Sequence, residues 1–298
     1  MGKGQVYHDP KFTYADTYSN RNIQRLTDYL GHSNHFYFTD PCWFNNNRSF
    51  VFTSQRENSG NLFRYDLDDG KITQITDLNT KSRPGGIVSA TNNAAYFWHG
   101  RQLIELNLET LAERIIHEQE GNMAPRGRAN PTADGKYICT HFQEEIPEDG
   151  PSISFAYSRF VEYFEKKPYS QIVRIEIETG KLNVIHEDNR YLGHINTSPS
   201  QANILTYCHE GPWARINQRI WASTSKPAKP GKSAIKKAKT SASVTNTGLP
   251  TANTSATTAA PAKAVATTSS ASSNTTTPTT AKSTSHFTPP TSTASTKP

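Results

Sequence analysis

Cysteine is scarce in this chain of 298 residues, and the three that occur, Cys42, Cys139 and Cys208, are widely spaced. An odd number of cysteines without a C-x-x-C pair argues against both a disulfide framework and the ligand spacing of a zinc or redox motif. Long hydrophobic runs are also lacking: the opening MGKGQVYHDPKF has no apolar signal core, and no segment approaches the length of a membrane span. We therefore expect reduced core thiols, a cytoplasmic location and no membrane partner.

Acidic residues, arginine and every aromatic residue except Phe287 are missing from residues 223–298. Serine, threonine, alanine and proline make up 56 of these 76 residues, so the segment cannot bury enough apolar surface to offset its chain entropy. We predict a disordered low-complexity tail, Ser/Thr/Ala/Pro/Lys-rich, and a folded domain over residues 1–222.

The tail also determines the net charge of +6, because it carries nine of the 32 Lys and Arg residues. The remaining segment has 23 basic against 26 acidic side chains, a balance of −3. A basic chain favours an anionic partner such as nucleic acid only when the basic residues belong to the folded domain. We expect no nucleic-acid partner.

Before Ala222 the sequence repeats one β unit. The first copy starts with an alternating strand, SFVFTS (49–54). A strand, an acidic glycine turn and a further strand follow in NLFRYDLDDGKITQIT (61–76). The unit returns in AAYFWHGRQLIELNLETLAERII (94–116) and in KYICTHF with QIVRIEIETGKLNVIHE (136–187), and it begins again in NILTYCHEGPW (203–213).

The spacing of these units favours a β-propeller. From Asp66 to Asn107 there are 41 residues, close to the roughly 40 to 45 of one blade. A β-sandwich also has short strands and frequent turns, but it gives no reason for repeated turn chemistry at this spacing. The sequence therefore predicts an all-β propeller with about four blades.

The third copy is longer and contains an insertion, SRFVEYFEKKP (158–168). Its pattern predicts a short helix that starts at Ser158 and stops before Pro168, with Phe160, Val161 and Phe164 on one face. We expect this helix to lie on the edge or face of a blade.

Specific sequence motifs give evidence beyond the repeat spacing. Three segments closely resemble oligogalacturonate lyase. They are GKGQVYHDPKFTYADTYSNRNIQRLT near the start, FEKKPYSQIVRIEIETGKLNVIHED in the middle and YLGHINTSPSQANILTYCHEGPWARINQRIW near residue 220. The resemblance covers nearly all of residues 1–222, and the LGH and CHEGP words are quite specific. It implies a seven-bladed propeller that cleaves pectin-derived oligogalacturonides in the cytoplasm with a divalent metal, usually manganese. This chain would then hold about the first half.

The implied reaction is β-elimination, in which a proton leaves C5 of a uronate and the C4 glycosidic oxygen departs. The proton is weakly acidic while the adjacent carboxylate is charged, so a cation must neutralise that carboxylate and a base must stand near C5. The resemblance implies a metal and an Arg as the cations and a His as the base.

Four residues are carried over as substrate-binding candidates. Arg219, in NQRIW, is the candidate for pairing with a substrate carboxylate, because a guanidinium fork fits a planar anion. His209 and Glu210 stand in CHEGP, and His194 stands in LGH. The alternative for each is a structural role, as an Arg at a strand start or as a hydrogen-bonded group in a turn.

His32, His35 and Cys42, in an N-terminal His-rich strand, are weaker candidates, since such a strand can simply pack.

The base and metal ligands that the resemblance implies have no counterpart in the sequence. The family's base lies in a THEFW or HEYW word after the position of Trp221, no such word occurs, and the only His beyond His209 is His286. When the codons of VTNTGLPTAN (244–253) are read in a shifted frame, they permit HEYW followed by two residues and DGK. We therefore hypothesise a frame shift after Ala222 that leaves a truncated, inactive lyase without catalytic or metal residues; the alternative is a non-enzymatic propeller fragment that acts as a protein-interaction module.

Overall fold

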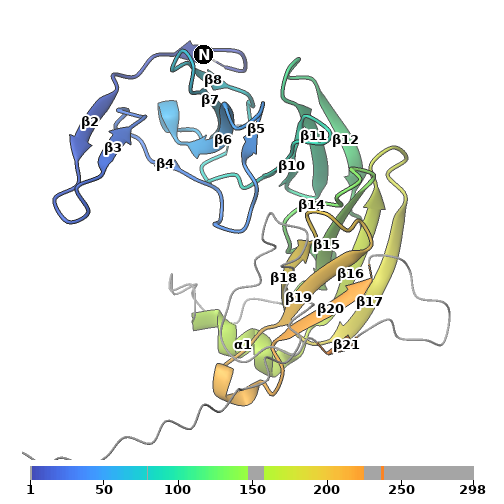
Figure 1. Ribbon diagram of the computed structural model, residues 1–298. Coiled ribbons are helices and arrows are strands. Elements are labelled where there is room, and N and C mark those ends of the chain that lie inside the picture. The colour runs from blue at the N-terminus through green and yellow to red at the C-terminus, as the bar shows by residue number, and fades with distance from the viewer. Residues whose placement is uncertain (1, 79, 147–157, 225–235, 238–298) are drawn as a thin grey trace, which may run out of the picture. The chain divides into compact units, whose positions relative to one another are not determined.

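The computed structural model describes residues 2–78, 80–146, 158–224 and 236–237 (Figure 1). The all-β prediction is confirmed, because the described chain is built mainly from antiparallel strands. Of the predicted tail, only residues 223–224 and 236–237 are described, so the expected disorder falls outside the described residues. Within that part of the chain, no helix has the length and apolar character needed to cross a membrane.

The strands form four main sheets that follow one another along the chain (Figure 1). The first contains β1 (Val6–Tyr7), β4 (Ser33–Asn34), β5 (Trp43–Phe44), β6 (Ser49–Ser54), β7 (Asn61–Asp66) and β8 (Ile72–Gln74). The second contains β9 (Ile87–Ser89), β10 (Ala94–His99), β11 (Gln102–Asn107) and β12 (Glu113–Glu118). A separate hairpin pairs β2 (Phe12–Ala15) with β3 (Asn22–Arg25).

The third sheet contains β13 (Met123–Pro125), β14 (Asn130–Pro131), β15 (Tyr137–Glu144), β16 (Tyr169–Glu176) and β17 (Leu182–Asn189). The fourth contains β18 (Leu192–Thr197), β19 (Ile204–His209), β20 (Ile220–Thr224) and β21 (Lys236–Lys237). Two short 3-10 helices cover Arg56–Asn58 and Trp213–Arg215. Strand β20 runs two residues past Ala222 and pairs with both β19 and β21.

The repeated turns read from the sequence share one hydrogen-bond pattern. In the first three sheets the amide of the fifth turn residue donates to the carbonyl of the first, from Gly70 to Asp66, from Leu111 to Asn107 and from Gly180 to Glu176. Each donor residue has a positive φ, 75° for Gly70, 60° for Leu111 and 71° for Gly180. This conformation suits glycine, and the second turn shows that leucine is accommodated there too.

Buried apolar clusters join each main sheet to the next. The first cluster contains Leu62 and Ile75 of the first sheet region and Phe97 of the second. The second joins the second and third sheets, and the third joins the third and fourth sheets. Four consecutive sheets that each pack on their neighbours match a run of propeller blades better than a two-layer sandwich. The number of blades and the closure of a ring remain predictions.

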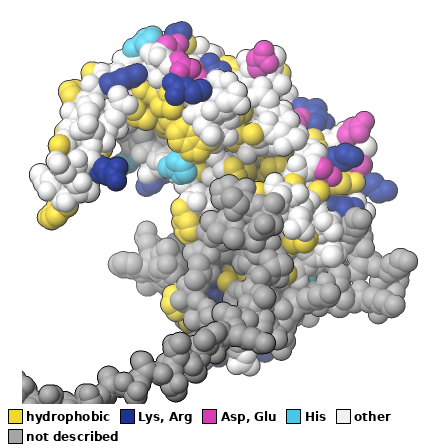
Figure 2. All heavy atoms as spheres, viewed as in Figure 1, with side chains coloured by type: hydrophobic (Ala, Val, Ile, Leu, Met, Phe, Trp, Pro, Cys, Tyr) yellow, Lys and Arg dark blue, Asp and Glu magenta, His cyan; other side chains and the backbone are white. Residues whose placement is uncertain are grey.

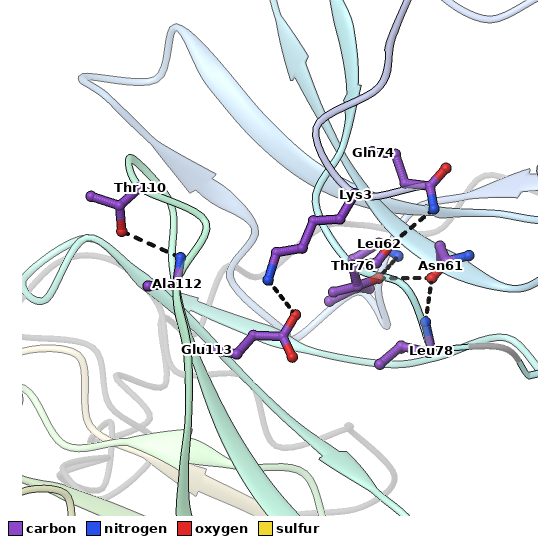
Figure 3. A network of polar contacts seen from close by, with 9 residues as sticks. All are labelled: Lys3, Asn61, Leu62, Gln74, Thr76, Leu78, Thr110, Ala112 and Glu113. Atoms are coloured by element: carbon purple, nitrogen blue, oxygen red, sulfur yellow. Dashed lines mark hydrogen bonds and ion pairs between the residues drawn. The ribbon is translucent and has the colours of Figure 1, made fainter. Parts of the chain in front are cut away.

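A polar network fixes the segment that follows β8 (Figure 3). The side-chain oxygen of Asn61 accepts hydrogen bonds from Thr76 Oγ1 at 3.0 Å and from the Leu78 amide at 2.8 Å. Thr76 Oγ1 in turn accepts from the Leu62 amide at 2.9 Å. Because these groups are buried, each bond also removes the cost of an unsatisfied polar atom.

Figure 2 shows the surface over the first two sheets. On the face shown, hydrophobic side chains gather over the first sheet beside a group of Lys, Arg, Asp and Glu side chains, and a second group of charged side chains lies over β11 and β12. Ion pairs at the second sheet include Arg114 with Glu105, at 2.6 Å, and Lys3 with Glu113, at 2.7 Å.

The insertion forms helix α1, Ser158–Lys166, which ends two residues before Pro168. The predicted helix is thus confirmed, but its predicted apolar face is partly wrong, because Val161 is exposed. Phe160, Tyr163 and Phe164 are half-buried instead, and Phe160 and Tyr163 pack on Tyr191.

Candidate functional site

A cavity of about 420 Å³ lies where residues of the first, third and fourth sheets meet helix α1. Its volume falls in the range of about 300 to 1,000 Å³ that is usual for small-molecule sites. Its lining includes charged, polar and aromatic side chains: Asp40, Arg126, Arg128, His141, Gln143, Phe160, Tyr163, Tyr191, His194 and Glu210.

Three of the four predicted substrate-binding residues meet beside this cavity. Glu210 is 6% exposed, and both of its carboxylate oxygens accept hydrogen bonds from Arg219 Nη2, at 3.0 and 3.1 Å. His194 Nε2 lies 3.5 Å from Glu210 Oε1. The carboxylate therefore sits between an imidazole and a guanidinium, and it holds both side chains in place.

Local backbone geometry places His194 next to Glu210. The pairing register of β18 with β19 shifts between Gly193 and Asn196, and His194 within this bulge has a φ of 47°. A bulge redirects the side chain it contains, and a left-handed φ at a non-glycine residue is a strained feature often found at functional sites. Gly193 supplies the space, because a Cβ there would lie 2.8 Å from Glu210 Cγ.

His209, the fourth candidate, belongs to different surroundings. Its ring packs on Trp221, with ring centroids 4.8 Å apart, and its Nε2 lies 3.7 Å from Asp188 Oδ2. Burial and the nearby Arg190 lower the pKa of His209 to about 4. His209 lines a second cavity, of about 480 Å³, which it shares with Glu210.

Several polar residues that line the 420 Å³ cavity were not predicted from the sequence. His141 and Gln143 lie two residues apart on β15 and are buried, at 4% and 1% exposure. Because side chains two residues apart on a strand lie on the same face, the alternation of His141 and Gln143 is the sequence feature that could have identified them as candidate site residues. His141 Nδ1 and Gln143 Oε1 have no hydrogen-bond partner in the structure as described.

Asp40 and Arg128 form an ion pair across the cavity wall. Asp40 is 5% exposed, and burial raises its pKa to about 6, which the Arg128 guanidinium offsets only in part. Arg128 also lies over the ring of Tyr37, with its Cζ 4.5 Å from the ring centroid. No sequence motif connected these residues, which come from the first and third sheets.

The histidines of the cavity are uncharged at neutral pH. Burial lowers the pKa of His141 to about 4, and the nearby His194 and Arg126 contribute in the same direction. Burial is also the main cause of the lowered pKa of His194, and the Glu210 carboxylate opposes it. The fixed positive charge at this site therefore comes from arginine.

The weaker N-terminal candidates have structural contacts. His35 Nδ1 lies 2.8 Å from the Phe36 carbonyl oxygen, and His35 Nε2 lies 2.9 Å from the buried Cys42 sulfur. Burial raises the pKa of the Cys42 thiol to about 12, so it remains protonated. His32 is exposed.

A metal site is not formed by the residues that the structure describes, since no group of three or more His, Cys, Asp or Glu side chains there is placed to hold an ion. A divalent metal needs several such donors close together. The donor set of the described residues therefore does not fit a manganese centre.

Curated relatives resemble this chain over most of its length. The oligogalacturonide lyase of Pectobacterium atrosepticum is 28% identical over 225 residues, which cover 74% of this chain and 56% of the relative. The oligogalacturonate lyase of Dickeya dadantii gives the same identity and coverage. The chain thus spans little more than half the length of the curated relatives it matches.

Solved structures share the fold. A structure titled "Oligogalacturonate lyase in complex with manganese" matches with a TM-score of 0.71 at 24% identity, covering 81% of this chain and 62% of that one. The oligogalacturonate lyase from Vibrio parahaemolyticus matches with a TM-score of 0.70 at 23% identity, covering 80% and 62%. At these identities the likeness establishes the fold.

The family model described as oligogalacturonate lyase matches residues 1–269, which include the LGH and CHEGP words and the Glu210 cluster. That match extends over most of the chain and confirms the resemblance read from the sequence. The chain belongs to the oligogalacturonate lyase family.

Proposed function

We propose that this chain is a truncated form of a cytoplasmic lyase that cleaves oligogalacturonides by β-elimination to unsaturated uronates, and that the chain itself binds these substrates without cleaving them. The observation that carries the proposal is the family model over residues 1–269. The cavity beside Glu210 and Arg219 is the proposed place of substrate binding. A protein-interaction module is the alternative, and the comparisons do not favour it.

Arg219 is proposed to neutralise the carboxylate next to the acidic C5 proton. Both oxygens of Glu210 accept from the same nitrogen, Nη2, so Glu210 occupies one corner of the guanidinium. An arginine side chain carries five N–H donors, and Glu210 engages only those of Arg219 Nη2. The Arg219 side chain is 19% exposed, so a second carboxylate can pair with its accessible part, and that pairing makes removal of the C5 proton easier.

A divalent metal such as manganese is part of the proposal, because the related structure is a manganese complex. The metal supplies further positive charge to a uronate carboxylate when it is bound. The described residues do not form its site, so no step is assigned to it and no residue is named as the base.

The experiment combines substrate binding with product formation. Wild type and Arg219→Met are titrated with trigalacturonate by calorimetry, and the unsaturated product is followed by its ultraviolet absorbance with added Mn²⁺. We expect binding by wild type and binding at least about tenfold weaker for Arg219→Met, the loss typical of one charge-assisted contact. Absence of saturable binding by wild type contradicts the proposal.

The frame-shift hypothesis makes a separate prediction in the same assay. We propose that the 298-residue chain binds without turnover, and that restoring the reading frame after Ala222 adds turnover. Turnover by the unrepaired polypeptide would contradict the assignment of the missing base and metal residues, while leaving the proposed substrate class intact.

A further inference from the structure

Among the charged side chains that line the 420 Å³ cavity, one positively charged group has no acidic partner. Among its lining side chains, Asp40 is paired with Arg128, and Glu210 is paired with Arg219 from outside the lining set. His141 and His194 have lowered pKa values and are uncharged near pH 7. Arg126 is exposed, and no carboxylate of the described residues pairs with it. The cavity therefore has a guanidinium suited to an added anion.

The position of Arg126 is fixed by its backbone. Its amide donates to the His141 carbonyl at 3.1 Å, and the amide of the next residue, Gly127, donates to the same oxygen at 3.3 Å. A Cβ at Gly127 would lie 2.5 Å from His141 Nδ1, so this turn packs directly on the buried imidazole. Arg126 lines the cavity together with His141 and Tyr191.

Aromatic rings provide another part of the lining. Tyr191 lies against two rings of α1, with centroid distances of 5.9 Å to Phe160 and 5.3 Å to Tyr163. All three residues line the cavity. Aromatic surfaces suit the apolar C–H face of a pyranose ring, whereas a small inorganic anion gains nothing from them.

Buried polar atoms complete the arrangement. Gln143 is 1% exposed, and its Oε1 has no hydrogen-bond partner in the described structure. A buried acceptor without a partner is costly, and a ligand hydroxyl group that donates to it would remove that cost. The combination of guanidinium, aromatic surface and hydroxyl acceptor matches a sugar acid.

We propose that Arg126, with the aromatic rings of α1 and Tyr191, forms a second uronate-binding subsite, which recognises the carboxylate of a galacturonate unit other than the one paired with Arg219. This inference rests on the proposed function, because it assumes an oligogalacturonide in the cavity. Arg128 is a less suitable anchor, since its charge is already committed to Asp40 and its guanidinium lies over Tyr37.

Calorimetric titration of the full chain with trigalacturonate tests the subsite, without added metal. Arg126→Met removes the guanidinium and keeps an unbranched side chain, and Arg126→Gln serves as a second variant. Arg21→Met is the matched control, because Arg21 is also exposed but belongs to the β2–β3 hairpin outside the lining set. Thermal melts check that each variant is folded.

We expect both Arg126 variants to bind trigalacturonate about tenfold more weakly than wild type, and Arg21→Met to bind within about twofold. Fully methyl-esterified trigalacturonate, which is neutral, should bind equally to wild type and to Arg126→Met. Phe160→Ala should weaken binding of the acid and the ester alike, because a ring contact does not depend on the carboxylate.

Two results separate the subsite from the proposed function. If wild type binds trigalacturonate and the folded Arg126 variants bind it equally well, the subsite is wrong and the proposed function stands. If wild type binds no trigalacturonate, the proposed function fails and the subsite fails with it. Equal losses for Arg126→Met and Arg21→Met would indicate general charge attraction and would also overturn the subsite.

Discussion

At the scale of single residues, Glu210 acts as a holder of other side chains. Its carboxylate is almost fully buried, accepts two hydrogen bonds from Arg219 and lies near His194. A buried carboxylate is expensive unless it is paired, and losing one partner leaves the other charge uncompensated. The sequence left two roles open for Glu210, direct substrate contact and a hydrogen-bonded structural role, and its contacts with Arg219 and His194 fit the second.

Glu210→Gln is predicted to lower the free energy of unfolding by about 2 kcal/mol, because the partly buried Arg219 loses its counter-charge. Urea denaturation at pH 7 measures this change. Glu165→Gln is the matched control: Glu165 pairs with Arg215, but both side chains are about half exposed, so the loss should stay below about 1 kcal/mol. Similar losses in the two variants would contradict the holding role.

The residues found from the sequence were those inside distinctive words. LGH and CHEGP led to His194 and Glu210, which the fold does bring together. Asp40 and Arg126 could not be found this way, because their proximity to Glu210 depends on how three separate sheets pack. His209 is adjacent to Glu210 in sequence and lines the 480 Å³ cavity with it, but its side chain packs on Trp221 and lies near Asp188, outside the group formed by Glu210, His194 and Arg219.

At the scale of elements, helix α1 is held against the fourth sheet by a close contact. Gly211 has a φ of 149°, and a Cβ there would lie 2.2 Å from Phe164 Cδ2. Arg215 adds an ion pair with Glu165, and its Cζ lies 4.7 Å from the Phe164 ring centroid. The position of the aromatic rings that line the cavity therefore depends on a glycine of the CHEGP word.

Gly211→Ala is predicted to destabilise the fold by about 2 to 3 kcal/mol, through backbone strain and the clash with Phe164. Gly100→Ala is the control, because Gly100 also has a positive φ but nothing lies within 4 Å of an added Cβ. Phe164→Ala should relieve part of the Gly211→Ala penalty, so the double variant should be more stable than additivity predicts. Strict additivity in chemical denaturation would exclude the steric contact.

The sequence was informative about elements wherever local chemistry decides them. The turns at Asp66, Asn107 and Glu176 lie as expected, because acidic or amide turn residues and alternating strands are local signals. The helix in the insertion also lies as expected, but its buried face does not, since Tyr163 rather than Val161 contacts the domain. Which helical face is buried depends on Tyr191, a residue from a different part of the chain.

At the scale of the whole molecule, stability should depend on contacts between neighbouring sheets. Each of the three main clusters joins one sheet to the next, and the contacts run in chain order. In arrays of this kind stability is approximately a sum of unit and nearest-neighbour terms, so damage at one interface need not spread through the chain.

Phe97 and Phe142 give a matched test of this nearest-neighbour behaviour, since each is 1% exposed and they belong to different clusters. Truncation of either ring to alanine should cost about 3 to 5 kcal/mol through lost burial and a residual cavity. Hydrogen exchange read by mass spectrometry should show faster exchange in the first and second sheets for Phe97→Ala, and in the second and third sheets for Phe142→Ala. The fourth sheet should keep its protection in Phe97→Ala, because its cluster, with Leu205 and Tyr207, shares no residue with the damaged one. Uniform loss of protection across all four sheets in both variants would mean that the described sheets unfold as one cooperative unit.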